Sequence, residues 1–230
     1  MDKFTKAQKI VEEYHKLRLD KKAKDAFGIN EKLRDLGYTD EEYLRDNFDF
    51  YLKSGIKVKY VTPSEALKNV ASAKGNTLLI SNLSEPCVYT GNSEFNTKYC
   101  KDNKIEIVSF GYSGGTIVTS SNDVGFLFIL DKQDLLAHLK SKISNWITTN
   151  VKKSEMVGND ILIDGMKVVG AAEKTIGDKR LYYFQVSFSV DLDLINNICS
   201  KKIIKKPGGL LDFGNKNRDE LITEVLSWLQ

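Results

Sequence analysis

Histidine and cysteine are scarce in this sequence, as is proline. The shortage of histidine and of cysteine each argues against a class of site. The 230 residues include two His, three Cys and three Pro. Neither His15 nor His138 has a serine, cysteine or carboxylate at a spacing typical of catalysis. Cys87, Cys100 and Cys199 leave one thiol over and form no Cys-x-x-Cys pair, which favours a reducing compartment and argues against a zinc site. Walker A and dinucleotide-binding glycine motifs are missing too, so no metal site and none of these nucleotide sites is predicted.

Long apolar runs and a large excess of one charge are also absent. No stretch approaches the ~18 apolar residues that span a bilayer, and the residues around Lys3 and Lys6 lack the apolar core of a signal peptide. A cytoplasmic protein with no membrane partner is therefore expected. The 34 basic and 31 acidic side chains nearly balance, and no helix-turn-helix with a basic recognition helix precedes residue 60, so a nucleic acid partner is not expected.

One basic cluster interrupts this balance, the segment Lys201-Lys202-Ile-Ile-Lys205-Lys206. Such clusters are most often the solvated edge of a strand or loop. Binding of a phosphate group or an acidic partner is the alternative interpretation.

The hydrophobic pattern changes near Gly55. Apolar residues at helical spacing predict two or three short helices in residues 1–55, which bury little surface alone and are expected to dock on the rest of the chain or on a protein partner. Residues 56–230 mix strands and helices without strict alternation, which predicts an α+β fold. The expected strands lie near 56–60, 78–83, 86–90, 105–110, 115–119, 125–130 and 181–190. Three helices are expected: one that starts at Thr62, one over about 132–149 and one over about 219–229.

The most informative segment runs from Asn159 to Ala172 and has the pattern of a β-hairpin. The Asp-Gly pair at 164–165 is a favoured two-residue hairpin turn. Lys167 follows in the second strand, and Gly170-Ala171-Ala172 lets another group pack close to the backbone. Lys167 could face a ligand or, as strand lysines commonly do, point into solvent. Asn159-Asp160 could hold a nucleotide or Mg²⁺, or simply form a turn.

The sequence of this hairpin resembles a motif in the catalytic domain of the lipoate–protein ligase and biotin–protein ligase family. In that family an Asn-Asp pair, a turn and a Lys-Val-x-Gly-x-Ala run surround the lysine that holds the activated acyl group, and Lys167 matches that lysine. Other segments match in the family's order. They are Ser64–Leu67, Leu78–Gly91, Tyr112–Val118, Gly125–Ile129 and Val190–Ile195, of which the last resembles the strand after the lysine hairpin.

This resemblance implies a fold, a site and a set of ligands. The fold would be α+β, with mixed and antiparallel sheets packed against helices in a ligase-like domain at 56–230, after a helical extension at 1–55. Lys167 would be the catalytic residue, and cofactor-binding roles would fall to Ser113, Gly114, Gly115, Asn159, Asp160, Gly170 and Ala171. ATP and Mg²⁺ would be the cofactors, lipoate or octanoate the substrate, and a lipoyl domain or other carrier protein the partner.

Three departures from the family pattern bear on activity. Phe110-Gly111 stands where the family has two arginines, Thr119-Ser120-Ser121 where it has a histidine, and Phe184-Gln185 where it often has His-Gly. A neutral Phe-Gly pair cannot bind phosphate as guanidinium groups do. Cys199 invites comparison with the cysteine acyl carrier of the octanoyltransferase branch, although a buried apolar cysteine fits its context better.

Two hypotheses follow from these matches and departures. In the first, the chain attaches a lipoate- or octanoate-type acyl group to a carrier-protein lysine through an acyl-adenylate. In the second, it is a catalytically inactive ligase-fold protein that serves as a binding, structural or assembly component, including one of a virus.

Overall fold

The computed structural model describes residues 6, 9–10, 35–37, 56–73, 75–82, 85–90, 94–109, 116–131, 136–199, 205–214 and 216–229. The chain divides into two compact units, Met1–Gly55 and Ile56–Gln230. Most of the helical segment expected at 1–55 lies outside the described residues, as do Phe110, Gly111, Ser113, Gly114 and Gly115.

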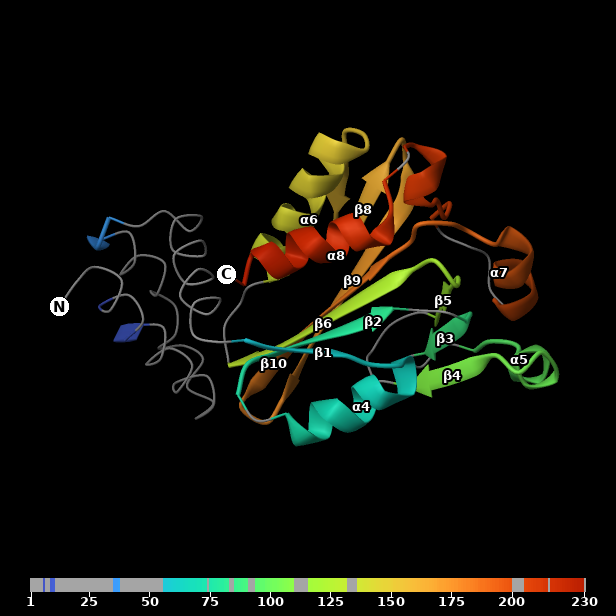
Figure 1. Cartoon of the computed structure of the whole chain (residues 1–230), viewed down its shortest axis with the longest axis horizontal. Coiled ribbons are helices and arrows are strands. Elements are labelled where there is room, and N and C mark those ends of the chain that lie inside the picture. The colour runs from blue at the N-terminus through green and yellow to red at the C-terminus, as the bar shows by residue number, and fades with distance from the viewer. Residues whose placement is uncertain are drawn as a thin grey trace. The chain divides into compact units, whose positions relative to one another are not determined.

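The second unit is built on a seven-stranded sheet and a three-stranded sheet (Figure 1). The large sheet has the strand order β1-β2-β6-β10-β9-β8-β7, and only β1 and β2 run parallel. Its strands are β1 (Lys57–Tyr60), β2 (Thr77–Asn82), β6 (Val124–Asp131), β7 (Glu155–Val157), β8 (Asp160–Ile163), β9 (Met166–Ile176) and β10 (Lys179–Val186). The small sheet has the order β4-β3-β5, with β3 (Cys87–Thr90), β4 (Glu106–Ser109) and β5 (Thr116–Thr119).

Helices flank both sheets. They are α4 (Pro63–Ser72), α5 (Thr97–Asp102), α6 (Leu136–Asn150), α7 (Leu192–Ile198) and α8 (Arg218–Ser227), with a short 3₁₀ turn η2 at Leu210–Asp212. The predicted α+β class is confirmed, with mixed sheets packed against helices. No helix in the described part of the chain is long and apolar enough to cross a membrane.

The two faces of the large sheet are covered by different elements. Side chains alternate between faces along a strand, so Leu79, Leu127 and Tyr183 share one face, which packs against α4 and the small sheet. We call this the α4 face. The opposite face carries fully buried aromatic rings such as Phe126 and Phe184, and α6 and α8 lie on that side of the sheet (Figure 1). We call it the α6 face.

Local sequence signals explain where two of the helices begin. Thr62 accepts a hydrogen bond from the Glu65 amide, and the Glu65 carboxylate accepts one from the Thr62 amide, so a capping box begins α4 at Thr62, where the sequence predicted a helix start. The expected strand at 190–195 is wrong. Asp191 accepts a hydrogen bond from the Leu194 amide and caps α7 instead, because a carboxylate at this position satisfies an amide of the first helical turn.

A buried carboxylate joins the end of β10 to the turn before β6. Asp123 is 2% exposed and accepts hydrogen bonds from the Ser120 amide, the Ser120 hydroxyl and the Phe188 amide at 2.9 to 3.1 Å. Burial raises the pKa of Asp123 to about 6, against the lowering effect of these hydrogen bonds. The carboxylate therefore connects two segments 65 residues apart in the sequence.

We expect Asp123 to give the protein a pH-dependent stability. Its folded pKa of about 6 lies above the ordinary value, so its stabilising contribution is complete below about pH 4 and is lost as pH rises through about 6. The loss amounts to at most about 3 kcal/mol of unfolding free energy. Asp123→Asn should remove this slope while lowering stability overall, because the amide cannot accept all three hydrogen bonds. Urea unfolding from pH 4 to 7 measures the difference, and parallel curves for the two proteins would contradict it.

Candidate active site

The hairpin predicted around Lys167 is present as β8 and β9. Asp164 and Gly165 form the two-residue turn with φ of 49° and 75°, and Ile163 pairs with Met166 on either side of it. Positive φ at both central residues is typical of a type I′ turn, for which Asp-Gly is a preferred sequence. The Lys152 ammonium binds the Asp164 carboxylate at 2.6 Å on the outside of this turn.

A β-bulge in β9 determines the direction in which Lys167 points. Leu162 of β8 pairs with Lys167, but the preceding residue of β8 pairs with Val169, so Val168 is an extra residue in β9. Residues three apart on a regular strand face opposite sides, whereas one extra residue brings them to the same side. Lys167 therefore shares the α4 face with Gly170, which pairs directly with Asp160.

On this face Asp160 lies between two lysines. The Lys167 Nζ is 2.8 Å from Asp160 Oδ1, and the Lys205 Nζ is 2.5 Å from Asp160 Oδ2. Burial acts to raise the pKa of Asp160, but the hydrogen bonds and charges of Lys167 and Lys205 outweigh it and hold that pKa below its ordinary value. The Asp160 side chain is 16% exposed and each lysine side chain 35%. We call these three residues the lysine cluster.

Gly170 forms the floor beneath the Lys167 side chain. A Cβ atom added at Gly170 would lie 3.1 Å from both the Cε and the Nζ of Lys167. The absence of a side chain at Gly170 therefore lets the ammonium lie close to the sheet. Lys167 does not extend freely into solvent, which was the alternative expected for a strand lysine.

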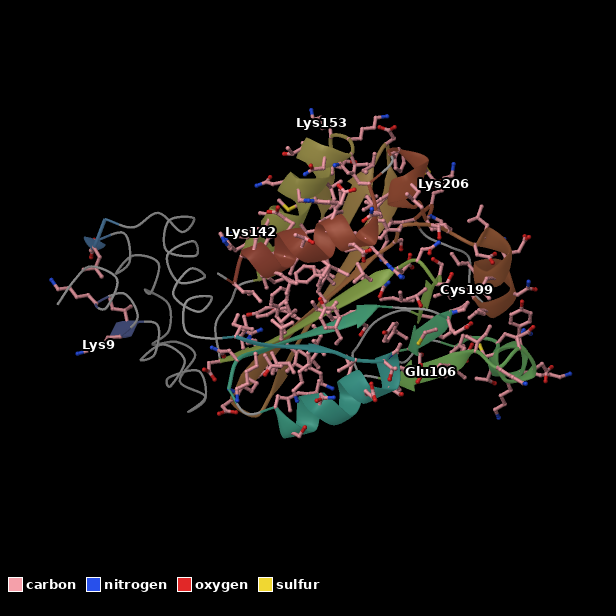
Figure 2. The ribbon with its side chains drawn as sticks, viewed as in Figure 1. Lys9, Glu106, Lys142, Lys153, Cys199 and Lys206 are labelled. Atoms are coloured by element: carbon pink, nitrogen blue, oxygen red, sulfur yellow. The ribbon has the colours of Figure 1, made fainter. Side chains whose placement is uncertain are left out.

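Lys205 reaches the cluster because its segment pairs with the start of β9. The Lys167 amide donates to the Lys206 carbonyl at 2.8 Å, and the Gly208 amide donates to the Lys167 carbonyl at 2.9 Å. Lys206 is exposed and is labelled in Figure 2. The predicted solvated edge thus holds for Lys206, whereas Lys205 forms an ion pair that sequence analysis missed, since nothing in the sequence links it to Asp160 across 45 residues.

A row of small and polar residues crosses the α4 face next to the lysine cluster. Register pairs connect five strands through Ser81, Gly125, Gln185, Gly170 and Asp160. Directly paired residues of neighbouring strands point to the same face. The row is therefore a line of small and polar positions beside the buried Leu79, Leu127 and Tyr183 of the same face.

Gln185 and Tyr183 fill the middle of this row. The Tyr183 hydroxyl donates to Gln185 Oε1 at 2.5 Å, and a Cβ added at Gly125 would lie 3.1 Å from the Tyr183 oxygen. Gln185 is 2% exposed, and its Nε2 is buried without a hydrogen-bond partner among the residues that the structure describes. An unsatisfied buried amide costs about 1 to 3 kcal/mol, so this arrangement calls for an explanation.

Two other residues that the family resemblance assigned to the site, Asn159 and Ala171, do not lie beside Lys167. Asn159 lies exposed in the turn before β8, where its carbonyl accepts a hydrogen bond from the Ala171 amide at 2.8 Å. Ala171 pairs with Phe184 and so lies on the α6 face, opposite Lys167. The structure thus brings together Lys167, Asp160 and Gly170, and adds Lys205 to them.

The lysine cluster does not suit Mg²⁺. Both Asp160 oxygens are bound by ammonium groups, and a magnesium ion needs free oxygen ligands. Within the described ranges no group of three or more His, Cys, Asp or Glu side chains could hold a metal. Cys199, at the end of α7 (Figure 2), is half-buried, and burial raises its pKa, which is the opposite of what a thiolate acyl carrier needs.

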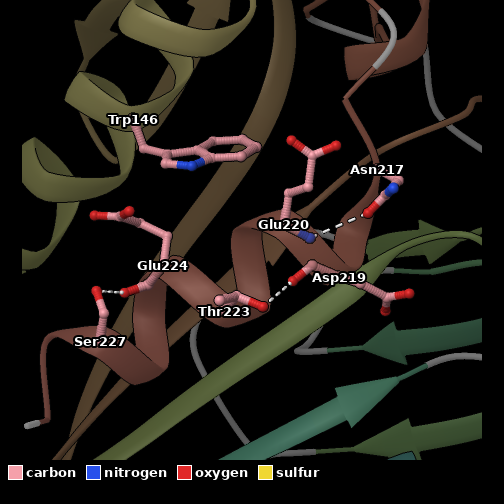
Figure 3. Close-up of a pocket in the computed structure, with 7 residues that line it drawn as sticks. All are labelled: Trp146, Asn217, Asp219, Glu220, Thr223, Glu224 and Ser227. Atoms are coloured by element: carbon pink, nitrogen blue, oxygen red, sulfur yellow. Dashed lines mark hydrogen bonds between the residues drawn. The ribbon is translucent and has the colours of Figure 1, made fainter.

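A separate concave site lies beside α8. A cavity of about 430 Å³ lies between Trp146 of α6 and one side of α8. Figure 3 shows the residues that line it. Its polar lining residues are Asn217, Asp219, Glu220, Thr223, Glu224 and Ser227. Glu220 pairs with Lys216 at 2.6 Å, and Glu224 accepts a hydrogen bond from the Trp228 indole at 2.9 Å. These carboxylates are paired near the surface, and the helices that carry them lie on the α6 side of the sheet.

Comparison with protein families identifies the domain. The model of the lipoyl protein ligase A/B catalytic domain matches residues 62–218, which include both sheets except β1, and the whole lysine cluster. The chain belongs to this family. The predicted membership of the lipoate–protein ligase and biotin–protein ligase family is confirmed. The hairpin on which Lys167 was matched to the family's lysine is present as β8 and β9. No curated protein sequence matches the chain.

Solved structures of the family share the fold at low identity. LipL1 of P. falciparum, in complex with lipoate, has a TM-score of 0.62 at 18% identity over 75% of this chain and 60% of LipL1, so the chain spans less than two thirds of that relative. The bi-partite lipoate protein ligase of T. acidophilum, with its E2 lipoyl domain, gives 0.58 at 15% over 76% and 82%. Lipoate-protein ligase A bound with ATP gives 0.58 at 15% over 75% and 83%.

We expect Gly170→Ala to disturb Lys167 with little loss of stability. The new methyl group would lie 3.1 Å from the lysine Nζ, and the flexible side chain can withdraw from Asp160 at a cost below about 1 kcal/mol. The Lys167 amine should then react faster with an amine-labelling reagent, as read by mass spectrometry.

Gly165→Ala is the matched control for this substitution. Gly165 has φ of 75° with nothing within 4 Å of the added atom, so the change should cost about 1 to 2 kcal/mol and leave Lys167 labelling unchanged. Equal labelling of Lys167 in all three proteins would show that Gly170 does not shape this site.

Proposed function

We propose that this protein activates a carboxylic acid, of the lipoate or octanoate type, and transfers the acyl group to a lysine of a carrier protein. The observation that supports this proposal is the placement of Lys167, whose ammonium lies over the bare backbone of Gly170 and beside Asp160. A fixed cation close to the sheet can stabilise negative charge that develops on a bound acyl phosphate.

The reaction would take place in two steps. In the first, a carboxylate oxygen of the acid attacks the α-phosphorus of ATP, the bond to pyrophosphate breaks, and an acyl-adenylate forms. In the second, the neutral amine of the carrier lysine attacks the acyl carbonyl, the bond to AMP breaks, and the amine loses a proton. Lys167 would take no part in these proton transfers, because its proposed role is electrostatic.

The proposed ligands follow from the relatives. LipL1 was solved with lipoate, lipoate-protein ligase A with ATP, and the T. acidophilum ligase with its E2 lipoyl domain. We propose the same kinds of ligand here: lipoate or octanoate as the acid, ATP with solvent Mg²⁺ as the activating cosubstrate, and a lipoyl domain as the acceptor. A cytoplasmic location is part of the proposal, because the odd number of cysteines without a Cys-x-x-Cys pair favours a reducing compartment.

Loss of Lys167 should abolish acyl-adenylate formation. Lys167→Ala removes the ammonium, and the loss of one charge-stabilising group typically lowers the rate by about 10² to 10³. Exchange of labelled pyrophosphate into ATP in the presence of octanoate or lipoate measures the first step alone.

Lys152→Ala is the matched control, because Lys152 also forms an ion pair with an aspartate of this hairpin but lies at the turn. It should retain full exchange. Undiminished exchange in Lys167→Ala would refute the assigned role.

A second candidate function is favoured by the residues that fill the α4 face. Gln185 is buried in the row that continues from Gly170, and Tyr183 is buried on the same face two residues earlier in β10. An acyl chain that lay along the row beside Lys167 would meet these two side chains. In this alternative the ligase fold serves as a binding, structural or assembly component without catalysis, and residues 1–55 supply its interface with a partner.

Gln185→Gly separates the two candidates. The substitution removes a buried side chain next to Gly170 and eliminates an unsatisfied amide, so it should open the row toward Lys167. If the acyl proposal holds, octanoate binding measured by calorimetry should strengthen in this variant by about tenfold or more, the equivalent of about 1.4 kcal/mol. Absence of octanoate binding and of exchange in both proteins would leave the non-catalytic candidate.

A further inference from the structure

We propose that Lys205 is a second anion-binding residue, and that the lysine cluster binds a phosphate or pyrophosphate group. This inference shares Lys167 with the proposed function and deepens it by naming the residue that would hold the phosphates. It does not require acyl transfer, so the two can fail separately.

The charges of the lysine cluster leave one positive charge over. A single carboxylate, Asp160, is bound by two ammonium groups, one on each oxygen. Each ammonium group has three N–H donors, and both lysine side chains are 35% exposed whereas Asp160 is 16% exposed. The two lysine side chains are thus more exposed than the carboxylate between them, which favours the approach of an anion to the lysines rather than to Asp160.

The arrangement of the two cations suits one phosphate group. Both ammonium nitrogens bind oxygens of the same small carboxylate, so they lie close enough together for a single phosphoryl group to contact both. Lysine binds phosphate as a point charge and is a common phosphate ligand in proteins. The neutral Phe110-Gly111 pair cannot supply such charge, and Lys205 would supply it from a different part of the chain.

The backbone of the Lys205 segment is held in place without help from the ion pair. It pairs with Lys167 through two backbone hydrogen bonds. Further along, Gly209 packs so tightly that an added Cβ would lie 2.6 Å from the Phe188 carbonyl oxygen and 2.8 Å from the Ser189 Cα. Because the segment is fixed against the sheet, the Lys205 side chain is positioned before any ligand arrives, which lowers the entropy cost of binding.

Titration calorimetry with pyrophosphate and, separately, with AMP tests the proposal at low ionic strength. Lys205→Gln should weaken pyrophosphate binding about tenfold or more, because a hydrogen bond to a charged group contributes about 1.5 to 3 kcal/mol. Lys206→Gln is the matched control: it removes an exposed positive charge from the neighbouring residue and should change the affinity less than about twofold. If the protein binds pyrophosphate more tightly than AMP, the lysine cluster is the site for the pyrophosphate that leaves ATP in the first step.

Asp160→Asn distinguishes an anion site from a structural ion-pair cluster. Removing the carboxylate raises the local charge, so pyrophosphate should bind more tightly and the affinity should fall more steeply with added salt. A merely structural cluster would lose stability in this variant without any gain in affinity.

The proposal is overturned if wild type does not bind pyrophosphate, if Lys205→Gln and Lys206→Gln behave alike, or if Asp160→Asn weakens binding. Lys205-dependent pyrophosphate binding without acyl-adenylate formation would reject the proposed function and keep this inference. If Lys205→Gln forms the acyl-adenylate with an unchanged KM for ATP, the proposed function is kept and the role of Lys205 in anion binding is rejected.

Discussion

The site depends on one extra residue in β9. Val168 shifts the register against β8, and this shift places Lys167 on the same face as Gly170 and Asp160. In a regular strand the lysine would point to the opposite face, which is filled by buried aromatic rings. The ion pair with Asp160, the position above Gly170 and the contact with the Lys205 segment all follow from that single irregularity.

The same sheet face combines two tendencies that differ in their consequences for function. On β8 and β9, Gly170 and the half-buried lysines Lys167 and Lys205 lie around Asp160. One strand further in, Tyr183 and Gln185 fill the space above Gly125 and bury an amide nitrogen that has no partner among the described residues. The fold of the lipoyl protein ligase family is retained, and the chemistry of the chain depends on which tendency governs access to Lys167.

The sequence was a good guide where the relevant interactions are local. The Asp-Gly turn, the start of α4 at its capping box and most of the expected strands and helices depend on residues close together in the chain, and these are present. The short elements α5 and β7 were not predicted. Val190–Ile195 was misread because it resembles the family's strand after the lysine hairpin, while Asp191 acts as a helix cap. Lys205 and Gln185 could not be found, since their roles depend on register and on contacts between distant segments, and no periodicity encodes those.

The pairing of the Lys205 segment with β9 also bears on the order in which the protein folds. The hairpin that carries Lys167 is closed by a two-residue turn, but Lys205 joins it across 45 residues, after β10 and α7 have been made. Contacts of long sequence separation form late, because a large loop must close first. A chain still emerging from the ribosome would therefore hold Lys167 and Asp160 as a simple pair, and the cationic cluster would be completed only after the Lys205 segment has been synthesised.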